Sequence, residues 1–542
     1  MILFRLALRS HRTGAIATAA IGAFAGLLNA VAYVSIAGPT PADRAAFAHS
    51  MEVIGQQLSY LLPRPVQLDT MGGYLTWRDL STVAIAYAVW ALLAATGAGR
   101  GDEEKGLSEA WLATGVARAR YLLVRMAAFA VAALASLGVT LLATELGTVV
   151  AKDTVPVAAM AAELLPLAGV TLWAFAAGLV VAQLVTTRRV ASVAAGIVIV
   201  ALYTLNSSLR AGADPAELGR VKWLSPFYLF DRSAPLLAGG SVDGLASALS
   251  LGGAVVLSGL SVWAFARRDI GGALVAGRPG SARPRHVPAA DPALRLPVLA
   301  GIAQQRGWIA GWAIAMAALA YFLSSLARSI VDGFKDIPAM QVYLARAGIA
   351  GYTDVVGVIW FSTALLLIAI FVVAQVNGWA ADDAEGRLEM ALAAGAARPR
   401  IVVERLAALI VAAGIVAAVS SLGVYLAANA FDIPVAGDRL ALATVLVLPV
   451  VFALGAIGHL LVGWRPRLAV VLVTTVAVIS YFTQEFAPLF DWPEWVGRTS
   501  LFVLYGAPMT NVDWGGAATL VVIGIVGTLV AIAALEQRDI GR

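Results

Sequence analysis

The sequence predicts an all-α membrane protein of about twelve transmembrane helices, arranged as two homologous six-helix halves in parallel orientation. Composition, hydropathy and an internal repeat lead to this fold class. The 542 residues are 60% hydrophobic and 13% charged, and the mean hydropathy is +0.84. Apolar runs of about 20 residues, long enough to cross a bilayer as helices, recur along the chain. These features exclude a soluble protein.

Twelve apolar runs supply the elements of this fold. The first run follows a basic start and is longer than the apolar core of a secretory signal, so we expect an uncleaved first span. The other runs follow at intervals that leave room for short loops. The predicted helices lie near residues 14–36, 80–99, 121–149, 155–185, 190–209, 245–266, 308–328, 353–378, 401–429, 440–463, 468–485 and 516–535.

The distribution of basic residues predicts the topology. An even number of spans puts both termini on one side of the membrane, and most Lys and Arg residues fall on that side. By the positive-inside rule it is the cytoplasmic side. We therefore expect a multi-pass protein of the cell (plasma) membrane with both termini cytoplasmic, and the net charge of +5 requires no nucleic acid partner. The cytoplasmic loops would be residues 100–125, 188–189, 267–306, 385–405 and 465–467.

A charged loop after the second predicted span is repeated in the second half of the chain. The two copies share an acidic pair, a glycine, a glutamate and an arginine at an offset of 280 residues. The letters RDIG also recur, ending at Gly271 and Gly541. A gene duplication explains both matches. It divides the chain into a first half (1–266), a cytoplasmic linker rich in Pro, Gly and Arg (267–306) and a second half (307–542). The matched loop residues are Asp102, Glu103, Gly106, Glu109 and Arg118, and Asp382, Asp383, Gly386, Glu389 and Arg398.

Each repeated loop is predicted to form a short amphipathic helix along the inner membrane surface. Acids precede arginines in both copies, which suits a helix dipole. Asp102 or Asp382 is predicted to cap the start, and Gly115 or Gly395 to end the helix. The arginines alone would satisfy the positive-inside rule, but acids contribute little to orientation. We therefore interpret the loops as docking surfaces for a partner.

This pattern, placed after the second span of a six-helix half, resembles the permease subunits of type-2 ATP-binding-cassette exporters. More narrowly, it resembles the fused two-half bacterial permeases called exporters of polyketide antibiotics, or tetronasin-type multidrug exporters. The family often has proline where this chain has Gly115 and Gly395. The resemblance implies that the loops carry coupling helices that fit into grooves on two ATPase subunits. It assigns that role to the ten matched residues, and it places ATP and Mg on the partner.

Catalytic machinery is not visible in the sequence. A P-loop requires a lysine after glycine, but Lys105, Lys152, Lys222 and Lys335 follow Glu, Ala, Val and Phe. The chain has no cysteine, and its four histidines are too scattered to indicate a metal cluster. We therefore expect no enzyme activity and no cofactor in this chain, and an energy source in a partner subunit.

Two other classes remain as alternatives. A secondary transporter driven by an ion gradient needs ionisable groups at mid-membrane, whereas Glu145, Glu163 and Asp354 fall near outer helix ends, where interfacial or helix-pairing roles are favoured. A lipid exporter or lipid-processing enzyme would need polar residues on an outer loop. Asp231, Arg232 and Asp243 are candidates, although loop solvation explains them.

The expected cargo is a hydrophobic small molecule, either a drug or a lipid. A lateral cavity lined by aromatic side chains would suit such a ligand, although aromatics at helix ends are more often interfacial. The candidate residues of this substrate path are Trp90, Trp173, Phe175, Trp312, Trp360 and Phe361.

Overall fold

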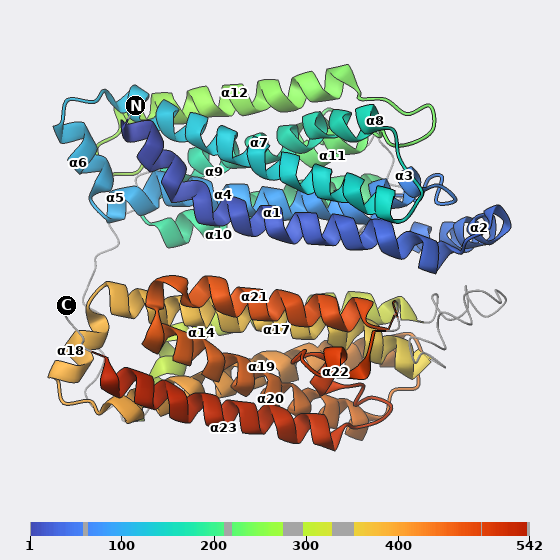
Figure 1. The fold of residues 1–542 in the computed structure, drawn as a ribbon. Helices are drawn as coiled ribbons and strands as arrows, with labels where there is room; N and C mark the ends of the chain where they lie inside the picture. The colour runs from blue at the N-terminus through green and yellow to red at the C-terminus, as the bar shows by residue number, and fades with distance from the viewer. Residues whose placement is uncertain are drawn as a thin grey trace. The chain divides into compact units, whose positions relative to one another are not determined.

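A computed structural model shows the predicted all-α membrane fold (Figure 1). It describes residues 2–57, 63–210, 219–274, 296–327, 352–488, 490 and 492–538. Within these residues, 12 helices are long and apolar enough to cross a membrane. The prediction of a multi-pass protein with about twelve spans is therefore confirmed.

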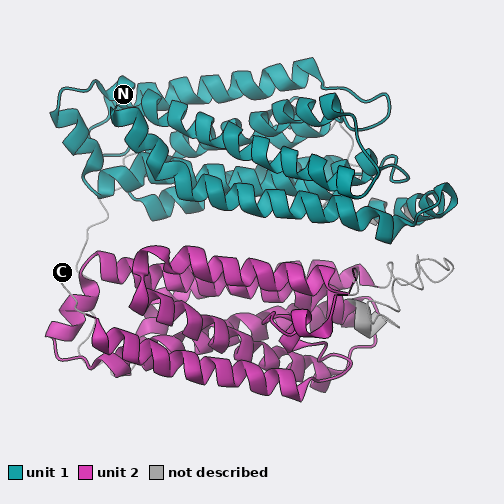
Figure 2. Ribbon diagram, viewed as in Figure 1, with its two compact units in different colours: residues 1–285 teal, residues 286–542 magenta. Residues whose placement is uncertain are grey.

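The chain forms two compact units, residues 1–285 and 286–542 (Figure 2). Each unit contains six of the candidate spans. The spans of the first unit are α1 (Ile2–Ala37), the composite helix Met71–Glu104, α7 (Arg118–Val150), the broken helix Val157–Leu184, α10 (Arg188–Arg210) and α12 (Gly244–Arg267). Those of the second unit are α14 (Pro297–Ser325), α17 (Tyr352–Ala384), α19 (Arg398–Ala430), α20 (Gly437–Trp464), α21 (Pro466–Phe486) and α23 (Trp514–Gln537).

Two of these helices are composite, and both lie in the first unit. The second span runs through α3 (Met71–Tyr74), η2 (Leu75–Leu80), α4 (Ser81–Thr96), η3 (Gly97–Gly101) and α5 (Asp102–Glu104), of which η2 and η3 are π-helical. The fourth span consists of α8 (Val157–Ala162) and α9 (Leu164–Leu184), which meet at Glu163. Such π-helical turns inside α-helices frequently occur at functional sites.

The helices of both units pack in the same pattern. In the first unit α1 packs on α7, and α9 lies between α4 and α12. In the second unit α14 packs on α19, and α20 lies between α17 and α23. Close approach of α1 and α7 depends on a glycine, because a Cβ on Gly147 would lie 2.8 Å from the carbonyl oxygen of Leu27. The shared pairing agrees with the sequence repeat.

Polar residues inside helices made some predicted boundaries wrong. The second span begins at Met71 rather than residue 80, because Thr76, Arg78 and Asp79 are helical although they interrupt the apolar pattern. Similarly, α14 begins at Pro297, where proline suits the first helical turn. Helix α14 thus covers the end of the predicted linker 267–306.

Candidate functional site

The two repeated loops have the same backbone path. Gly106 at φ 69° precedes α6 (Leu107–Ala113), and Gly386 at φ 74° precedes α18 (Arg387–Ala393). We call α6 and α18 the loop helices. In each unit the loop helix lies at the end of the bundle where the chain terminus also lies (Figure 1). The prediction of a short helix in each loop is thus confirmed.

The predicted C-terminal ends of the loop helices are correct, and the predicted N-terminal caps are wrong. Gly115 at φ 85° and Gly395 at φ 89° follow the loop helices, and left-handed glycines are the usual helix stop. The predicted caps are wrong, because Gly106 and Gly386 occupy the N-cap positions. Asp102 belongs instead to the last turn of the second span. Its carboxylate is therefore free to bind another helix.

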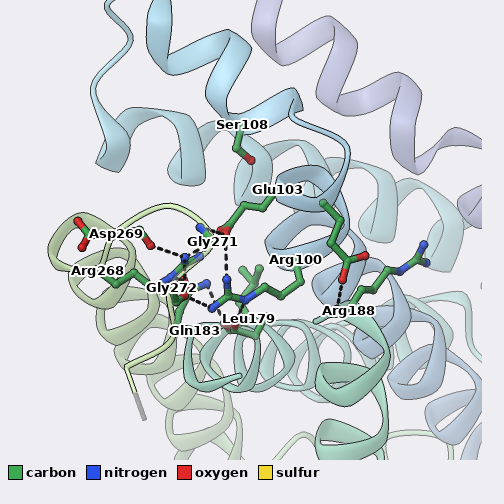
Figure 3. A network of polar contacts seen from close by, with 12 residues as sticks. Arg100, Glu103, Ser108, Leu179, Gln183, Arg188, Arg268, Asp269, Gly271 and Gly272 are labelled. Carbon is green, nitrogen blue, oxygen red and sulfur yellow. Dashed lines mark hydrogen bonds and ion pairs between the residues drawn. The ribbon is translucent and has the colours of Figure 1, made fainter. Parts of the chain in front are cut away.

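Glu103 lies at the centre of a buried ion cluster in the first unit (Figure 3). Its side chain is 3% exposed and accepts hydrogen bonds from Arg100 at 2.9 Å and from Arg268. The backbone N–H of Gly271 donates to the same carboxylate at 3.2 Å. Glu103 therefore joins the loop to the segment that follows α12.

The two arginines of this cluster have further partners. Arg100 donates to the carbonyl oxygens of Ala182, at the end of α9, and Gly272, both at 2.6 Å. Arg268 donates to the amide oxygen of Gln183 at 2.7 Å. Buried guanidinium groups need this degree of satisfaction. The cluster therefore also holds the end of the fourth span.

The second unit contains a simpler version of the cluster. Asp383, which matches Glu103 in the repeat, binds Arg538 at 2.8 Å. This pair is partly exposed, with side chains 11% and 26% accessible. At the position of Arg100 the repeat has Ala380. Only the first unit therefore surrounds this acid with two buried guanidinium groups in the described residues.

The first acid of each pair binds the third span of its unit. Asp102 forms an ion pair with Arg125 of α7. Asp382 binds Arg405 of α19 at 2.8 Å. Asp382 also accepts a hydrogen bond from Arg387, and together with Glu385 it raises the pKa of that arginine. Each acidic pair therefore connects its loop to two other parts of the bundle.

The repeated arginines Arg118 and Arg398 bind the ends of the sixth spans. Arg118 donates to the carbonyl oxygen of Arg268 at 2.6 Å. Arg398 donates to the carbonyl oxygens of Leu535 and Glu536, both at 2.7 Å. The recurrence of the RDIG letters now has a physical reason, because their arginine and its carbonyl bind the loop. The final Gly541 lies outside the described residues.

Glu109 and Glu389 differ from the other repeated acids. Both are exposed, and neither side chain has a hydrogen bond or ion pair within the part of the chain that the structure describes. Exposed apolar residues lie beside them, Leu107 at 45% and Met390 at 63% accessibility. The outward surface of each loop helix thus presents an acid and a large apolar side chain, and α18 also exposes Arg387. The other repeated acids and arginines bind within the chain.

The aromatic residues predicted to line a substrate path mostly fill helix interfaces. Phe175 is buried and stacks on Phe129 with ring centroids 3.8 Å apart, and Trp90 packs on the same ring at 5.0 Å. The Trp173 indole lies against Gly253 of α12. The structure therefore brings Trp90 and Phe175 together through Phe129, as core packing.

The aromatics of the second unit are dispersed. Trp312 packs on Phe371 with centroids 5.8 Å apart, and Phe361 lies 5.9 Å from Tyr505. Trp360 is fully buried at 1% exposure. A hollow of about 330 Å³ does exist in the first unit, between α1 and α7, but none of the six predicted residues lines it.

Acids that were considered for ion coupling or catalysis have different surroundings. Glu163 is 1% exposed, and neither carboxyl oxygen has a partner among the described residues. Asp231 binds Arg210 at 2.6 Å, and Asp243 caps α12 and binds Arg232 at 2.7 Å. These loop charges therefore have structural partners. The side chain of Asp354 lies outside the described residues.

Sequence reasoning missed Asp79. The predicted second span began at residue 80, which placed Asp79 in a loop. In the structure it lies in the span Met71–Glu104 and is 1% exposed. The available signal was the single acid one residue before an apolar run.

Comparison with known proteins shows that the second half of the chain resembles one protein family. The family described as "Multidrug efflux system permease Rv1217c, C-terminal domain" matches residues 294–536. A search of curated proteins found no match. The second half of the chain is thus similar to a multidrug efflux permease family, which supports a transporter permease in the membrane. Groups of three or more side chains suited to a metal ion are absent from the described residues.

Proposed function

We propose that the chain is the membrane permease of an exporter for hydrophobic drugs or antibiotics, powered by a separate ATP-binding-cassette ATPase. One observation carries this proposal: in each unit the loop helix is flanked by an acidic pair before it and an arginine after it, and these flanking residues bind several spans of their own unit. A loop that only connected two spans would not need these contacts. The family match supports an efflux permease, and the ATPase is our inference from the loops.

The contacts explain how force on a loop would reach the transmembrane helices. In the first unit Asp102 binds α7, Glu103 binds the segment after α12, and Arg118 fastens the start of α7 to that segment. A movement of α6 would therefore displace the ends of the second, third and sixth spans together. We infer that such coupled displacement drives alternating access. Cargo taken from the cytoplasm or inner leaflet would then leave outside.

The partner contact is assigned to the outward surfaces of the loop helices. Glu109 and Glu389 would pair with bases on two copies of the ATPase, and Leu107 and Met390 would add apolar contact. The remaining repeated residues position the loop helices through internal bonds. ATP and Mg would be bound by the partner, and both loops and both termini would be cytoplasmic.

Copurification tests this assignment. Charge reversal of rim residues weakens electrostatic docking, so Glu109→Lys should reduce the bound ATPase from two copies to one. Adding Glu389→Lys should release both copies. Exposed Glu494, which belongs to a different loop, provides the matched control as Glu494→Lys. Native mass measurement of the solubilised complex gives the stoichiometry.

The result would contradict the proposal if the double variant inserted normally and still held two active ATPase subunits. Vigorous ATP hydrolysis by the isolated chain would also contradict it, because the chain lacks a P-loop lysine.

Ion-driven transport is a second candidate, favoured by Asp79. A buried acid within a span is typical of ion-coupled transporters. Transport into inverted vesicles, measured with the ion gradient collapsed and ATP present, separates the two. Export that continues supports the ATPase, and export that stops supports ion coupling.

A further inference from the structure

Asp79 is a buried acid inside a span of the first unit. It lies in η2, the π-helical turn of the second span, and is 1% exposed. One carboxyl oxygen accepts a hydrogen bond of 3.3 Å from the Asn29 amide, and the other has no partner among the described residues. An ionised carboxylate there would lose its hydration without gaining a cation. The neutral acid is therefore the stable form in this conformation.

Charged neighbours do not neutralise Asp79 by contact. The adjacent Arg78 is exposed on the same helix and attracts the Asp79 carboxylate without forming a salt bridge to it. On α7 the nearest ionisable group is Glu145, next to Thr144 in the sequence. Glu145 has the same charge sign as Asp79, and one of its carboxyl oxygens is buried without a partner among the described residues. On α1 the facing polar group is the neutral Asn29. Salt bridges to Asp79 are absent from the described residues.

A glycine lets α1, α7 and Asp79 meet. A Cβ placed on Gly26 would lie 1.9 Å from the Thr144 hydroxyl and 3.2 Å from the unpartnered oxygen of Asp79. Both oxygens therefore approach the same point on α1. The Thr144 hydroxyl donates to the carbonyl oxygen of Thr140 at 3.0 Å in this conformation. Rotation about its side-chain bond would aim it toward the carboxyl group.

Hydroxyl groups continue from this point along α7. Ser136, Thr140 and Thr144 recur every four residues, so they share one helix face. Tyr87 of α4 joins two of them, with its hydroxyl 2.8 Å from Ser136 and 2.9 Å from Thr140. Ser136 also lines the open hollow between α1 and α7, where Arg9 and Arg12 are exposed. We call Tyr87, Ser136, Thr140 and Thr144 the hydroxyl ladder.

The second unit has the same helices without this chemistry. At the repeat offset of 280 residues, Ile359 and Leu367 replace Asp79 and Tyr87. Val416 and Val424 replace Ser136 and Thr144, and of the four ladder positions only that of Thr140 keeps a hydroxyl, as Ser420. The shared fold therefore forms without an acid at the Asp79 position and without a continuous ladder. A purely structural requirement of the fold does not explain them.

We propose that Asp79 is an exchangeable proton-binding site, connected by the hydroxyl ladder to the hollow between α1 and α7. On release, the Asp79 carboxylic acid gives its proton to the Thr144 hydroxyl and becomes a carboxylate. Each hydroxyl accepts one proton and passes one on. The Thr144 hydroxyl, which here donates to the backbone carbonyl of Thr140, and the Ser136 hydroxyl, which here donates to the carbonyl oxygen of Ala15 at 3.0 Å, rotate for their steps, and the last proton leaves from Ser136 to water. Uptake reverses these steps. The site belongs to the first half alone, and its existence does not depend on an ATPase partner.

Infrared spectroscopy of the full chain in lipid nanodiscs tests the site. At neutral pH we expect a carbonyl band of a protonated carboxylic acid that disappears in Asp79→Asn. Glu163→Gln is the matched control, because Glu163 is a second buried acid without partners. It should remove a different band and leave that of Asp79 unchanged. A spectrum in which Asp79→Asn removes no such band would overturn the proposal.

Deuterium exchange tests the path. After transfer to heavy water, the Asp79 band should shift faster than the Glu163 band. Tyr87→Phe removes only the hydroxyl that joins the ladder, so it should slow the Asp79 shift by about tenfold while leaving the Glu163 shift unchanged. Thr140→Val provides a second near-isosteric variant with the same expected effect. Equal exchange at Asp79 in the wild type and in both variants would overturn the ladder and make Asp79 a static structural acid.

Discussion

Replacing Glu103 by glutamine should destabilise the first unit strongly. The substitution keeps the shape of the side chain but removes the charge that faces Arg100 and Arg268, which are 1% and 5% exposed. Two buried guanidinium groups would then remain without a carboxylate. Breaking a buried ion pair by removing one partner typically costs about 3–5 kcal/mol. Because the amide oxygen can still accept one hydrogen bond, we expect a loss of about 3 kcal/mol.

The matched control lies six residues along the same loop. Glu109 belongs to the same repeat but is exposed and makes no ion pair with the described residues. Surface substitutions of this kind usually change the free energy of unfolding by less than about 0.5 kcal/mol. Reversible unfolding of the full chain in a detergent titration would measure both variants. Both variants lose one negative charge. The difference between their free energies of unfolding therefore gives the contribution of burial and ion pairing at Glu103.

A double-mutant cycle then identifies the partner. Arg268→Gln alone leaves Glu103 with Arg100, whereas both substitutions together remove a charge of each sign. Contacting residues typically show coupling energies of about 0.5–3 kcal/mol, and a buried pair should fall near the upper end. The reasoning is refuted if Glu103→Gln and Glu109→Gln unfold alike, or if the cycle shows no coupling.

Three further predictions concern the repeat and the helix caps. In the second unit Asp383→Asn should cost only about 1–2 kcal/mol in the same titration, because its pair is partly exposed and lacks a second guanidinium; a loss as large as that of the first-unit variant would contradict the difference between the clusters. Gly106→Ala should cost about 1–2 kcal/mol because its φ is 69°, whereas Gly138→Ala, at a helical site open to a Cβ, should be neutral or stabilising. The pKa of Asp243 is lowered by the backbone N–H of Ala246 and by a neighbouring arginine. Its stabilising effect is present above the ordinary carboxyl range and lost as pH falls through the lowered pKa, so acid should reduce the wild-type melting temperature more than that of Asp243→Asn.

The sequence determined the membrane fold because burial in a bilayer depends on local composition. Each span is a continuous apolar run, and backbone groups in lipid must be satisfied within the helix. The repeated acids, glycines and arginines likewise predicted two equivalent surface helices, since both are short-range patterns. Helix starts were less certain at Asp79 and Pro297, where polar or proline residues lie in or begin helices and apolar periodicity gives no signal.

Tertiary structure decided what the repeated charges bind. The sequence contained both the acidic pair and the RDIG ends, but Glu103 and Arg268 are 165 residues apart. Their contact forms only because the second, fourth and sixth spans converge at one end of the bundle. The same convergence left Glu109 outside and exposed. Exposure and burial of identical residue types therefore follow from helix packing, which no local pattern encodes.

For the aromatic side chains and Asp79 too, the sequence determined the position along the chain and helix packing determined the surroundings. Trp90 and Phe175 meet only through Phe129, a third residue from another span. Asp79 was hidden from sequence reasoning because its burial depends on Gly26 allowing α1 to approach the second and third spans. Composition placed these residues in or beside the membrane. Only the packing of three helices decided that the aromatics fill an interface and that the carboxyl group of Asp79 is buried.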